Sequence, residues 1–311
     1  MKRPVIRLAP KKVIDCYDIA SLSILAGVED YTEGIYNGNS QTPYEQAQKN
    51  QHNYLLSQVS AWNGFKLLDV GCGNGTLLET AKERGVDGVG ITVSESQVAY
   101  CQSKGLDVRL YNYKELPESF DGYFDGIIAN GSLEHFVQPE DALNGKQDKI
   151  YEEMFEIFHR VIDPNSKSRR VATTSINFNL KVDPCKFILS PFRQLHDKEG
   201  FHFSVLYRGY GGFYPIKGQL EKCAEGAFKL LNEQDATLDY RYTSEHWKET
   251  FQKAFRSNRE FRSRLVKYLV KKPIHTAFFV SSFFIFESWP WQFQGENPPT
   301  RLYRHTWEMV D

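Results

Sequence analysis

The segment Lys66-Leu67-Leu68-Asp69-Val70-Gly71-Cys72-Gly73-Asn74-Gly75 decides the fold of this 311-residue chain. A short apolar run ends on glycines, as a buried parallel strand does where it turns into a helix. The following helix is predicted over Thr76 to Arg84, with Gly85 as its C-terminal stop. Glycines between a strand and a helix let the chain turn tightly and bring backbone amides close to a ligand. The segment therefore predicts a ligand-binding loop in an α/β protein.

The spacing of these glycines excludes two common phosphate-binding loops. A dinucleotide fingerprint needs a glycine at position 76, where the chain has Thr76, and no Gly-Lys-Ser/Thr of a phosphate loop follows. What remains is an acid followed by Gly-x-Gly-x-Gly, which is how S-adenosylmethionine (SAM) methyltransferases hold their cofactor. We expect Asp69 to act, through water or backbone, on the amino-acid part of SAM. Gly71 and Gly73 would let the backbone pass close to it.

Strands and helices alternate through the middle of the chain, which predicts a Rossmann-like, seven-stranded, doubly wound sheet. Further strands are expected at 88–91, 108–111, 124–129 and 171–176, with helices from Ser94 to about Lys104 and over 150–161. Two late strands are expected at 236–242 and 277–287, with a helix over 244–269 between them. The run 278–286 is interpreted as the buried last strand rather than as a membrane contact.

This pattern predicts one α/β domain with additional cover at both ends. We divide the chain into an N-terminal helical cap (1–62), a SAM-binding core (63–176), an insertion or lid after the fifth strand (177–232), and a final part whose strands and helix complete the core (233–311).

Composition narrows the class of protein. Lys and Arg total 38 against 39 Asp and Glu, which argues against a dedicated nucleic-acid binder. The residues Met1-Lys2-Arg3-Pro4 lack the apolar core of a secretory signal, and five dispersed cysteines suit reduced thiols, so a cytoplasmic protein is expected. We expect at most peripheral membrane contact, and no metal site, since no Cys or His pairs have ligand spacing. Trp289-Pro290-Trp291 is a candidate edge of a pocket or a homodimer.

Several motifs carry a family resemblance. Gly90-Ile91-Thr92-Val93-Ser94-Glu95-Ser96-Gln97 resembles the Gly-Leu-Thr-Leu-Ser-x-x-Gln signature of cyclopropane-fatty-acid synthases and related methyltransferases. The segment Tyr31-Thr32-Glu33-Gly34-Ile35-Tyr36 is similar to the family's Tyr-Ser/Thr-Cys-Gly/Ala-Tyr stretch, and Glu45-Gln46-Ala47-Gln48 to its Glu-x-Ala-Gln helix start. Gly131-Ser132-Leu133-Glu134-His135-Phe136 resembles its Gly-x-Phe-Glu-His motif. The resemblance runs from about Tyr17 to Ile176.

The resemblance implies a set of cofactor contacts. Most SAM enzymes grip the ribose with an acid after the second strand, whereas this group uses Thr and Gln. The implied contacts are Tyr31 and Thr32 for the methionine carboxylate, Thr92 and Gln97 for the ribose, Asn112 and Tyr113 for the adenine, and Asn130 at the end of the fourth strand.

The chain departs from the family at the catalytic base. Cyclopropane synthases hold a bicarbonate with cysteine, glutamate, histidine and tyrosine, and only Glu134 matches here. Glu33 stands in the cysteine's place, the histidine's place falls near Thr174, and Trp247 stands in the tyrosine's place. Two carboxylates would repel an anion but suit proton removal or binding of a cationic amine. The catalytic candidates are therefore Glu134, His135 and Glu33.

The aromatic segment 185–214 is a candidate wall for the acceptor. Tyr207 and Tyr210, together with Trp247, are the expected substrate contacts, although these rings could equally pack the insertion onto the sheet. We expect a methyltransferase that acts on carbon or nitrogen of a small or lipid-like metabolite. The alternatives are a cyclopropane or lipid-methylating synthase with a rebuilt base site, and a SAM-binding protein without turnover.

Overall fold

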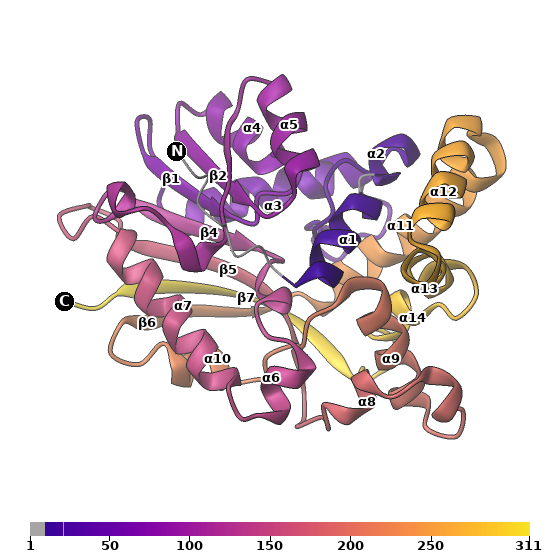
Figure 1. Cartoon of the computed structure of the whole chain (residues 1–311). Helices are drawn as coiled ribbons and strands as arrows, with labels where there is room; N and C mark the ends of the chain where they lie inside the picture. The colour runs from indigo at the N-terminus through magenta and orange to yellow at the C-terminus, as the bar shows by residue number, and fades with distance from the viewer. Residues whose placement is uncertain (1–9, 21) are drawn as a thin grey trace, which may run out of the picture.

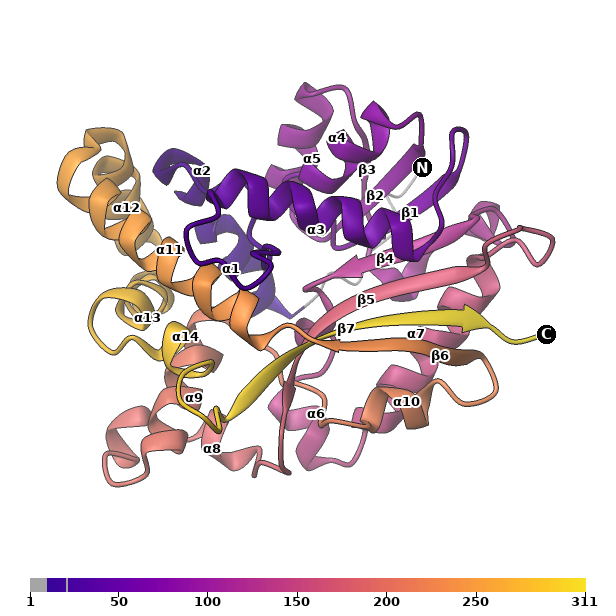
Figure 2. The ribbon, with the colours of Figure 1, turned by 180° about the vertical axis from the view of Figure 1, so that it is seen from behind.

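The computed structural model describes residues 10–20 and 22–311, so the N-terminal segment Met1 to Pro4 lies outside the described residues. One sheet of seven strands runs through the molecule in the order β3-β2-β1-β4-β5-β7-β6 (Figures 1 and 2). Strands β1 to β5 are parallel to one another, and β7 is antiparallel to both β5 and β6. The strands are β1 Lys66–Val70, β2 Asp87–Thr92, β3 Asp107–Leu110, β4 Gly126–Asn130, β5 Arg170–Phe178, β6 Phe228–Asp235 and β7 Thr300–Met309. The Rossmann-like, doubly wound sheet is thus confirmed.

Helices cover both faces of this sheet. One face packs against α3 and α4, whose apolar side chains meet those of β1, β4 and β5. The other face packs against α7, where Phe155 lies 5.1 Å from Trp307 of β7 between ring centroids. These helices are α3 Tyr44–Gln58, α4 Thr76–Glu83, α5 Glu95–Ser103, α6 Pro139–Leu143, α7 Gln147–Val161 and α10 Gln219–Cys223. At the start of α5, Ser94 accepts a hydrogen bond from the backbone N–H of Gln97, as its sequence pattern predicts.

The two predicted late strands are wrong. Residues 236–242 begin the helix α11 Thr237–Ser257, and 277–287 belong mainly to the helix α13 Pro273–Phe284. The predicted helix 244–269 is two helices, since α11 ends before α12 Arg259–Lys271. The run 278–286 is likewise helical up to Phe284 and is not the last strand. Its phenylalanines follow a proline at the first helical turn, a position that favours a helix start.

The true late strands lack an apolar pattern. In β6, Phe228 is the only buried residue, because this strand lies at the edge of the sheet. In β7, buried Arg304 and His305 interrupt the alternation of polar and apolar residues that predicts a strand. Both strands are instead defined by their pairing, which no local pattern encodes.

Helices also cover the carboxyl ends of the parallel strands, at the end of the molecule opposite the labelled C-terminus (Figures 1 and 2). This cover consists of α1 Lys11–Ala20, α2 Leu22–Ala26, α8 Cys185–Ile188, α9 Lys198–Tyr210, α11, α12, α13 and α14 Ser288–Trp291. Part of it therefore falls within 233–311, which we expected to hold strands and one helix; the domain boundaries themselves stay a prediction. Among the described residues, no helix combines the length and apolarity needed to cross a membrane.

Candidate functional site

The glycine loop after β1 has the backbone that its sequence requires. Gly71, Gly73 and Gly75 have φ of 81°, 53° and 79°, in the region that favours glycine. A Cβ on Gly71 would lie 2.6 Å from Cβ of Ser132, whereas one on Gly73 would enter open space. Gly71 therefore allows the loop to pack against the segment after β4, and Gly73 leaves room beside the loop.

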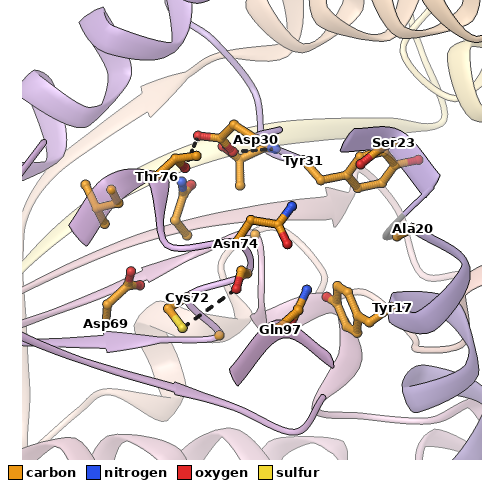
Figure 3. A pocket seen from close by; sticks show the side chains of 16 residues that line it. Tyr17, Ala20, Ser23, Asp30, Tyr31, Asp69, Cys72, Asn74, Thr76 and Gln97 are labelled. Atoms are coloured by element: carbon orange, nitrogen blue, oxygen red, sulfur yellow. Dashed lines mark hydrogen bonds between the residues drawn. The ribbon is translucent and has the colours of Figure 1, made fainter. Parts of the chain in front are cut away.

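Three adjoining cavities lie where β1, β2 and β4 end. The loop cavity is lined by residues that include Asp30, Tyr31, Thr32, Asp69, Gly71, Gly73, Gln97 and Asn130 (Figure 3). The outer cavity, of about 280 Å³, is lined by residues that include Ile91, Thr92, Gln97, Asn112, Tyr113, His135 and Phe136. The inner cavity, of about 40 Å³, is lined by residues that include Cys16, Glu134, His135, Ile176, Tyr210, Tyr214, Tyr240 and Trp289. Tyr17 of α1 lines all three cavities.

The loop cavity has a polar wall that begins at Asp30. Its carboxylate accepts hydrogen bonds from the hydroxyls of Thr32 (2.7 Å) and Thr76 (2.8 Å) and lies 2.6 Å from Nε2 of His52. Burial alone would raise the pKa of Asp30, but these hydrogen bonds and the charge of His52 hold it below its ordinary value. The carboxylate thus fixes three chain segments around one edge of the cavity.

The opposite wall depends on Asn130 at the end of β4. Its amide exchanges two hydrogen bonds with the amide of Gln51 of α3, at 2.9 and 3.2 Å. Thr174 of β5 donates to the same Asn130 oxygen at 2.8 Å. Thr174, which stands near the family histidine's place, therefore orients Asn130 and is not among the residues that line the inner cavity.

Asp69 is the acidic residue of the loop cavity. Its side chain is buried, and its Oδ2 has no hydrogen-bond partner among the described residues. Burial raises the pKa of this carboxyl to about 8, and the charge of Asp30 adds to the effect. A carboxylate in this position would be stabilised by a cationic group of a ligand, since the described residues form no ion pair with Asp69.

The outer cavity contains the residues predicted for the nucleoside. The hydroxyl of Thr92 donates to the side-chain oxygen of Gln97 at 2.6 Å, which fixes the Gln97 amide at the junction of two cavities. Tyr113 stacks on Phe136 with ring centroids 4.0 Å apart, and Asn112 accepts a hydrogen bond from the backbone of Lys114. The structure thus brings Thr92, Gln97, Asn112 and Tyr113 to one cavity.

The inner cavity contains two of the three catalytic candidates. Oε1 of Glu134 accepts the backbone N–H of Ile176 at 2.7 Å, while its Oε2 and Nδ1 of His135 are buried without a partner among the described residues. Burial raises the pKa of Glu134 to about 7 and lowers that of His135 to about 4. The cavity therefore presents a carboxyl that can exchange a proton near neutral pH, beside a neutral imidazole.

The third candidate, Glu33, is held elsewhere. It is buried against Arg304 of β7 (Nε to Oε1, 3.3 Å) and does not line the three cavities. Burial raises its pKa, and the charge of Arg304 opposes the rise. Arg304 also pairs with Asp239 of α11 at 3.0 Å, so this contact ties the segment before α3 to β7 and α11. The geometry favours a structural role for Glu33.

Only one of the three predicted acceptor contacts lines the inner cavity. Tyr210 does so, and its hydroxyl lies 2.9 Å from that of Ser282. Trp247 is fully buried behind Tyr31, on which it stacks at 4.3 Å, and its Nε1 donates to the hydroxyl of Tyr44. Tyr207 directs its hydroxyl to Glu140 at 2.8 Å and is not among the lining residues. The substrate roles of these residues stay predictions.

Sequence analysis missed three residues that build the site. Tyr17, Asp30 and Gln51 lie in the N-terminal 62 residues, where we assigned roles only to the segment that resembles the family motif. Asp30 directly precedes that motif, so an acid beside the matched Tyr31 was a usable signal. Nothing local marks Tyr17 or Gln51, since their roles arise from contacts with distant segments.

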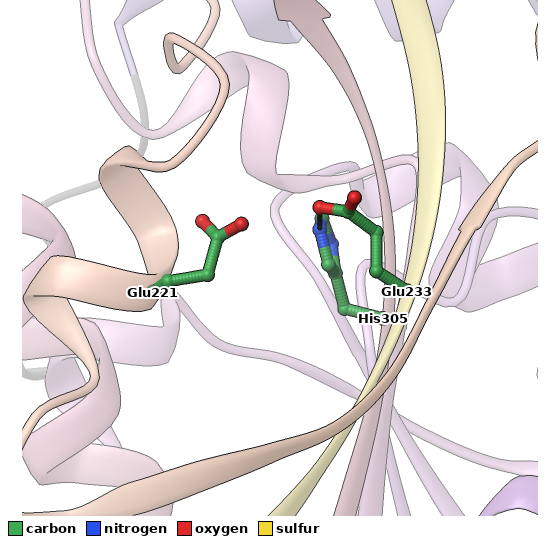
Figure 4. Close-up of side chains that lie close together, drawn as sticks. All are labelled: Glu221, Glu233 and His305. Carbon is green, nitrogen blue, oxygen red and sulfur yellow. Dashed lines mark hydrogen bonds and ion pairs between the residues drawn. The ribbon is translucent and has the colours of Figure 1, made fainter.

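A group of possible metal ligands lies away from the cavities, on β6, β7 and α10. Oxygen or nitrogen atoms of Glu221, Glu233 and His305 come within 4.8 Å of one another (Figure 4). Nε2 of His305 lies 3.4 Å from Glu233, and Lys217 approaches Glu233 at 3.8 Å. Lys217 thus supplies positive charge to this cluster, and Glu221, Glu233 and His305 are not among the residues that line the three cavities.

The sequence matches a known family over most of its length. Residues 18–272 match the family described as mycolic acid cyclopropane synthetase. Cyclopropane mycolic acid synthase 2 of Mycobacterium leprae is 29% identical over 147 residues, which cover 40% of this chain and 46% of that protein. A ubiquinone biosynthesis O-methyltransferase of Acinetobacter baumannii is 26% identical over 191 residues, or 54% of this chain and 80% of that protein. The chain spans about half the length of the first curated relatives that it matches.

Solved structures share the fold at low identity. The cyclopropane synthase MmaA2 from Mycobacterium tuberculosis superposes with a TM-score of 0.72 at 18% identity, covering 98% of this chain and all of that one. Coclaurine N-methyltransferase, solved with N-methylheliamine and S-adenosylhomocysteine (SAH), superposes with a TM-score of 0.72 at 14% identity, covering 98% of this chain and 84% of that one. Sheet order, glycine loop and the extended sequence match lead to one conclusion. The chain belongs to the mycolic acid cyclopropane synthetase family.

Proposed function

We propose that this protein is a SAM-dependent methyltransferase whose acceptor is an amine carried on an apolar molecule. One observation carries the proposal. Oε2 of Glu134 and Nδ1 of His135 are buried with no partner in the described part of the chain, and they line an aromatic cavity that shares Tyr17 and Tyr31 with the loop cavity. Such a cavity combines a proton acceptor with the faces of aromatic rings, which attract cations.

The residues of the cleft fit SAM. The ammonium group of its methionine part would satisfy the unpartnered oxygen of buried Asp69, and the open space beside Gly73 leaves room for it. The outer cavity, with Tyr113 stacked on Phe136 and the fixed amide of Gln97, suits a nucleoside. When bound, SAM supplies a methyl group activated by its positive sulfur. Asp69, Gln97, Asn130 and Tyr31 are the residues that we expect to hold it.

The inner cavity determines what the acceptor can be. At about 40 Å³ it accommodates a small headgroup rather than a chain. Rings of Tyr17, Tyr210, Tyr240 and Trp289 line it and exclude water from the reacting groups. Glu134 takes up the proton that the amine loses as its nitrogen gains the methyl group. The carboxyl can do so because burial raises its pKa to about 7.

The cavity offers little to a bicarbonate. Its lining includes no Lys or Arg of residues 10–20 and 22–311, and burial keeps His135 neutral, so these residues would leave a bound anion facing Glu134 without a compensating positive charge. Among the structural neighbours, one cyclopropane synthase was solved with SAH and CTAB, and coclaurine N-methyltransferase was solved with an N-methylated ligand. The N-methylated ligand supports an acceptor with a basic nitrogen, whereas the quaternary nitrogen of CTAB has no lone pair and cannot accept a methyl group. Cyclopropanation, the activity that names the family, is the second candidate.

The experiment measures SAH formation with matched acceptors. The purified chain is incubated with SAM and either the secondary amine N-methylhexadecylamine, hexadecanol, or vesicles of an unsaturated phosphatidylglycerol. Products are identified by mass spectrometry. An N,N-dimethylated tertiary amine formed from the secondary amine alone supports the proposal. A methylene added to the unsaturated lipid would replace it with cyclopropanation, and SAM binding without SAH from any acceptor, unchanged in Glu134→Gln, would favour a protein without turnover.

A further inference from the structure

A strongly basic surface covers the outer side of α11 to α13, and we call it the α12 patch. Between Lys253 and Lys272 the chain has eight basic side chains and one acidic side chain, although the whole protein has a formal charge of −1. The basic members are Lys253, Arg256, Arg259, Arg262, Arg264, Lys267, Lys271 and Lys272. Exposed apolar side chains lie among them, and these are Phe255, Val266, Leu269, Val270 and Ile274.

The helix α12 separates a buried stripe from this surface. Phe261 and Leu265 are buried, where α12 packs against α2 and α13. Val270 and Ile274, at the end of α12 and the start of α13, are 78% and 72% exposed. Both ribbon views show α12 at the outer edge of the molecule, at the end opposite the labelled C-terminus (Figures 1 and 2). The apolar side chains are therefore presented outward and do not belong to the core.

Most of the positive charge in the patch is uncompensated. Arg264 pairs with Glu260 at 3.1 Å and Lys272 with Asp15 at 2.6 Å. Across the described ranges, Lys253, Arg256, Arg259, Lys267 and Lys271 form no ion pair. Like charges at this density repel one another, so a partner with negative charge would stabilise the surface.

A second apolar surface lies at the same end of the molecule, around α8. It consists of Leu180, Leu189, Phe192 and Leu195, all exposed, with Arg193 among them. In both views α8 and α12 lie on the side where helices cover the strand ends. Two separate apolar surfaces on one side of the protein fit an extended partner that contacts both better than a small partner that contacts one.

We propose that the α12 patch docks on the surface of an anionic lipid bilayer. Basic side chains attract anionic headgroups, and apolar side chains beside them enter the boundary between headgroups and acyl chains. A nucleic acid would use the positive charge but would leave Val270 and Ile274 in water, so a bilayer fits both properties of the patch. This inference stands independently of the proposed reaction. Docking would also bring lipid-like acceptors to the side of the protein that covers the inner cavity.

The test compares binding of the full chain to vesicles of phosphatidylcholine alone and mixed with phosphatidylglycerol. We expect cosedimentation with the anionic vesicles only. The variant Arg259→Gln/Lys267→Gln/Lys271→Gln should bind about a hundredfold more weakly, because each basic side chain contributes roughly fivefold near such a surface. The variant Val270→Ser/Ile274→Ser should lose at least about tenfold through its apolar contacts. Both variants change only exposed side chains, so the protein should keep its fold.

Matched controls are taken from other surfaces. Lys146→Gln/Lys149→Gln/Lys167→Gln removes three exposed charges, and Leu231→Ser removes an exposed apolar side chain of β6. Both should bind anionic vesicles like the unchanged protein, and all variants should bind SAM equally in calorimetry, which separates this inference from the cofactor site. Absence of vesicle binding, equal loss in the controls, or binding to duplex DNA or RNA in place of vesicles would overturn the proposal.

Discussion

Replacement of Glu134 by glutamine should make the protein inactive yet more stable at alkaline pH. Glu134 is buried, and only one of its two oxygens has a hydrogen-bond partner among the described residues. Glutamine has nearly the same shape and can keep the hydrogen bond from Ile176, but it cannot take up a proton. The substitution therefore separates the proton chemistry of this side chain from its packing.

The expected stability change follows from the pKa. Burial raises the pKa of Glu134 from 4.5 to about 7, so the folded state holds this proton more tightly than the unfolded state does. Stability should fall as pH rises from about 4.5 to about 7, by roughly 3 kcal/mol in total. Glutamine escapes this penalty but buries an amide donor without a partner, which costs about 1 kcal/mol. Relative to the unchanged protein, Glu134→Gln should gain roughly 2 kcal/mol at pH 8.

The assay is urea unfolding of both proteins at pH 5 and pH 8, with Glu83→Gln as the exposed control. The stability difference between Glu134→Gln and the unchanged protein should be small or negative at pH 5 and positive at pH 8. For a general base, methyl transfer to an amine should fall by about 10² to 10⁴ while SAM affinity is unchanged. An equal stability difference at both pH values would refute the burial of an ionisable carboxyl, and full activity would refute its role as a base.

Other substitutions test the cofactor cleft and the structural ion pair. Gly73→Val puts a branched side chain into the open space beside the loop at φ 53°, so calorimetry should detect no SAM binding; unchanged affinity would count against the site. Because the pKa of Asp30 is lowered in the folded state, the unchanged protein should lose stability as pH falls below about 4. In Asp30→Asn this loss should be absent, which thermal unfolding at several pH values measures. Glu33→Ala should cost about 3–5 kcal/mol in urea unfolding because Arg304 stays buried, while Glu33→Gln should keep most methyl transfer. Inactivity of a stable Glu33→Gln would restore Glu33 as a catalytic candidate.

The parts of the fold that the sequence predicts are those with a strong local signal. The strand that ends at Val70 is followed by glycines that adopt the positive φ expected of the loop, and the N-cap Ser94 follows from its pattern with Gln97. The same holds for the family motifs, whose residues Thr92, Asn112 and Asn130 meet at the cleft. Local sequence decides these positions because few conformations satisfy them.

The remainder depends on contacts between distant segments. The strand β7 contains Arg304 in its buried centre, and its charge is compensated by Glu33 and Asp239, each more than 60 residues away in the sequence. The assignment of Glu33 as a catalytic candidate failed to foresee this pairing for the same reason. Tyr17 lies on a helix that ordinary amphipathic patterns describe, and its place at the junction of three cavities arises from the tertiary fold.

Total charge was similarly uninformative about the surface. A net charge of −1 argues against a protein that binds polyanions throughout, but it averages over segments whose charges differ widely. Electrostatic attraction at physiological ionic strength acts over about 8 Å, so a partner senses the charge of one surface and not that of the chain. Eight basic side chains and one acidic side chain lie between Lys253 and Lys272, in the same segment as the exposed Val270. The local charge of a helix at the edge of the fold is therefore the quantity that decides which surface this protein can approach.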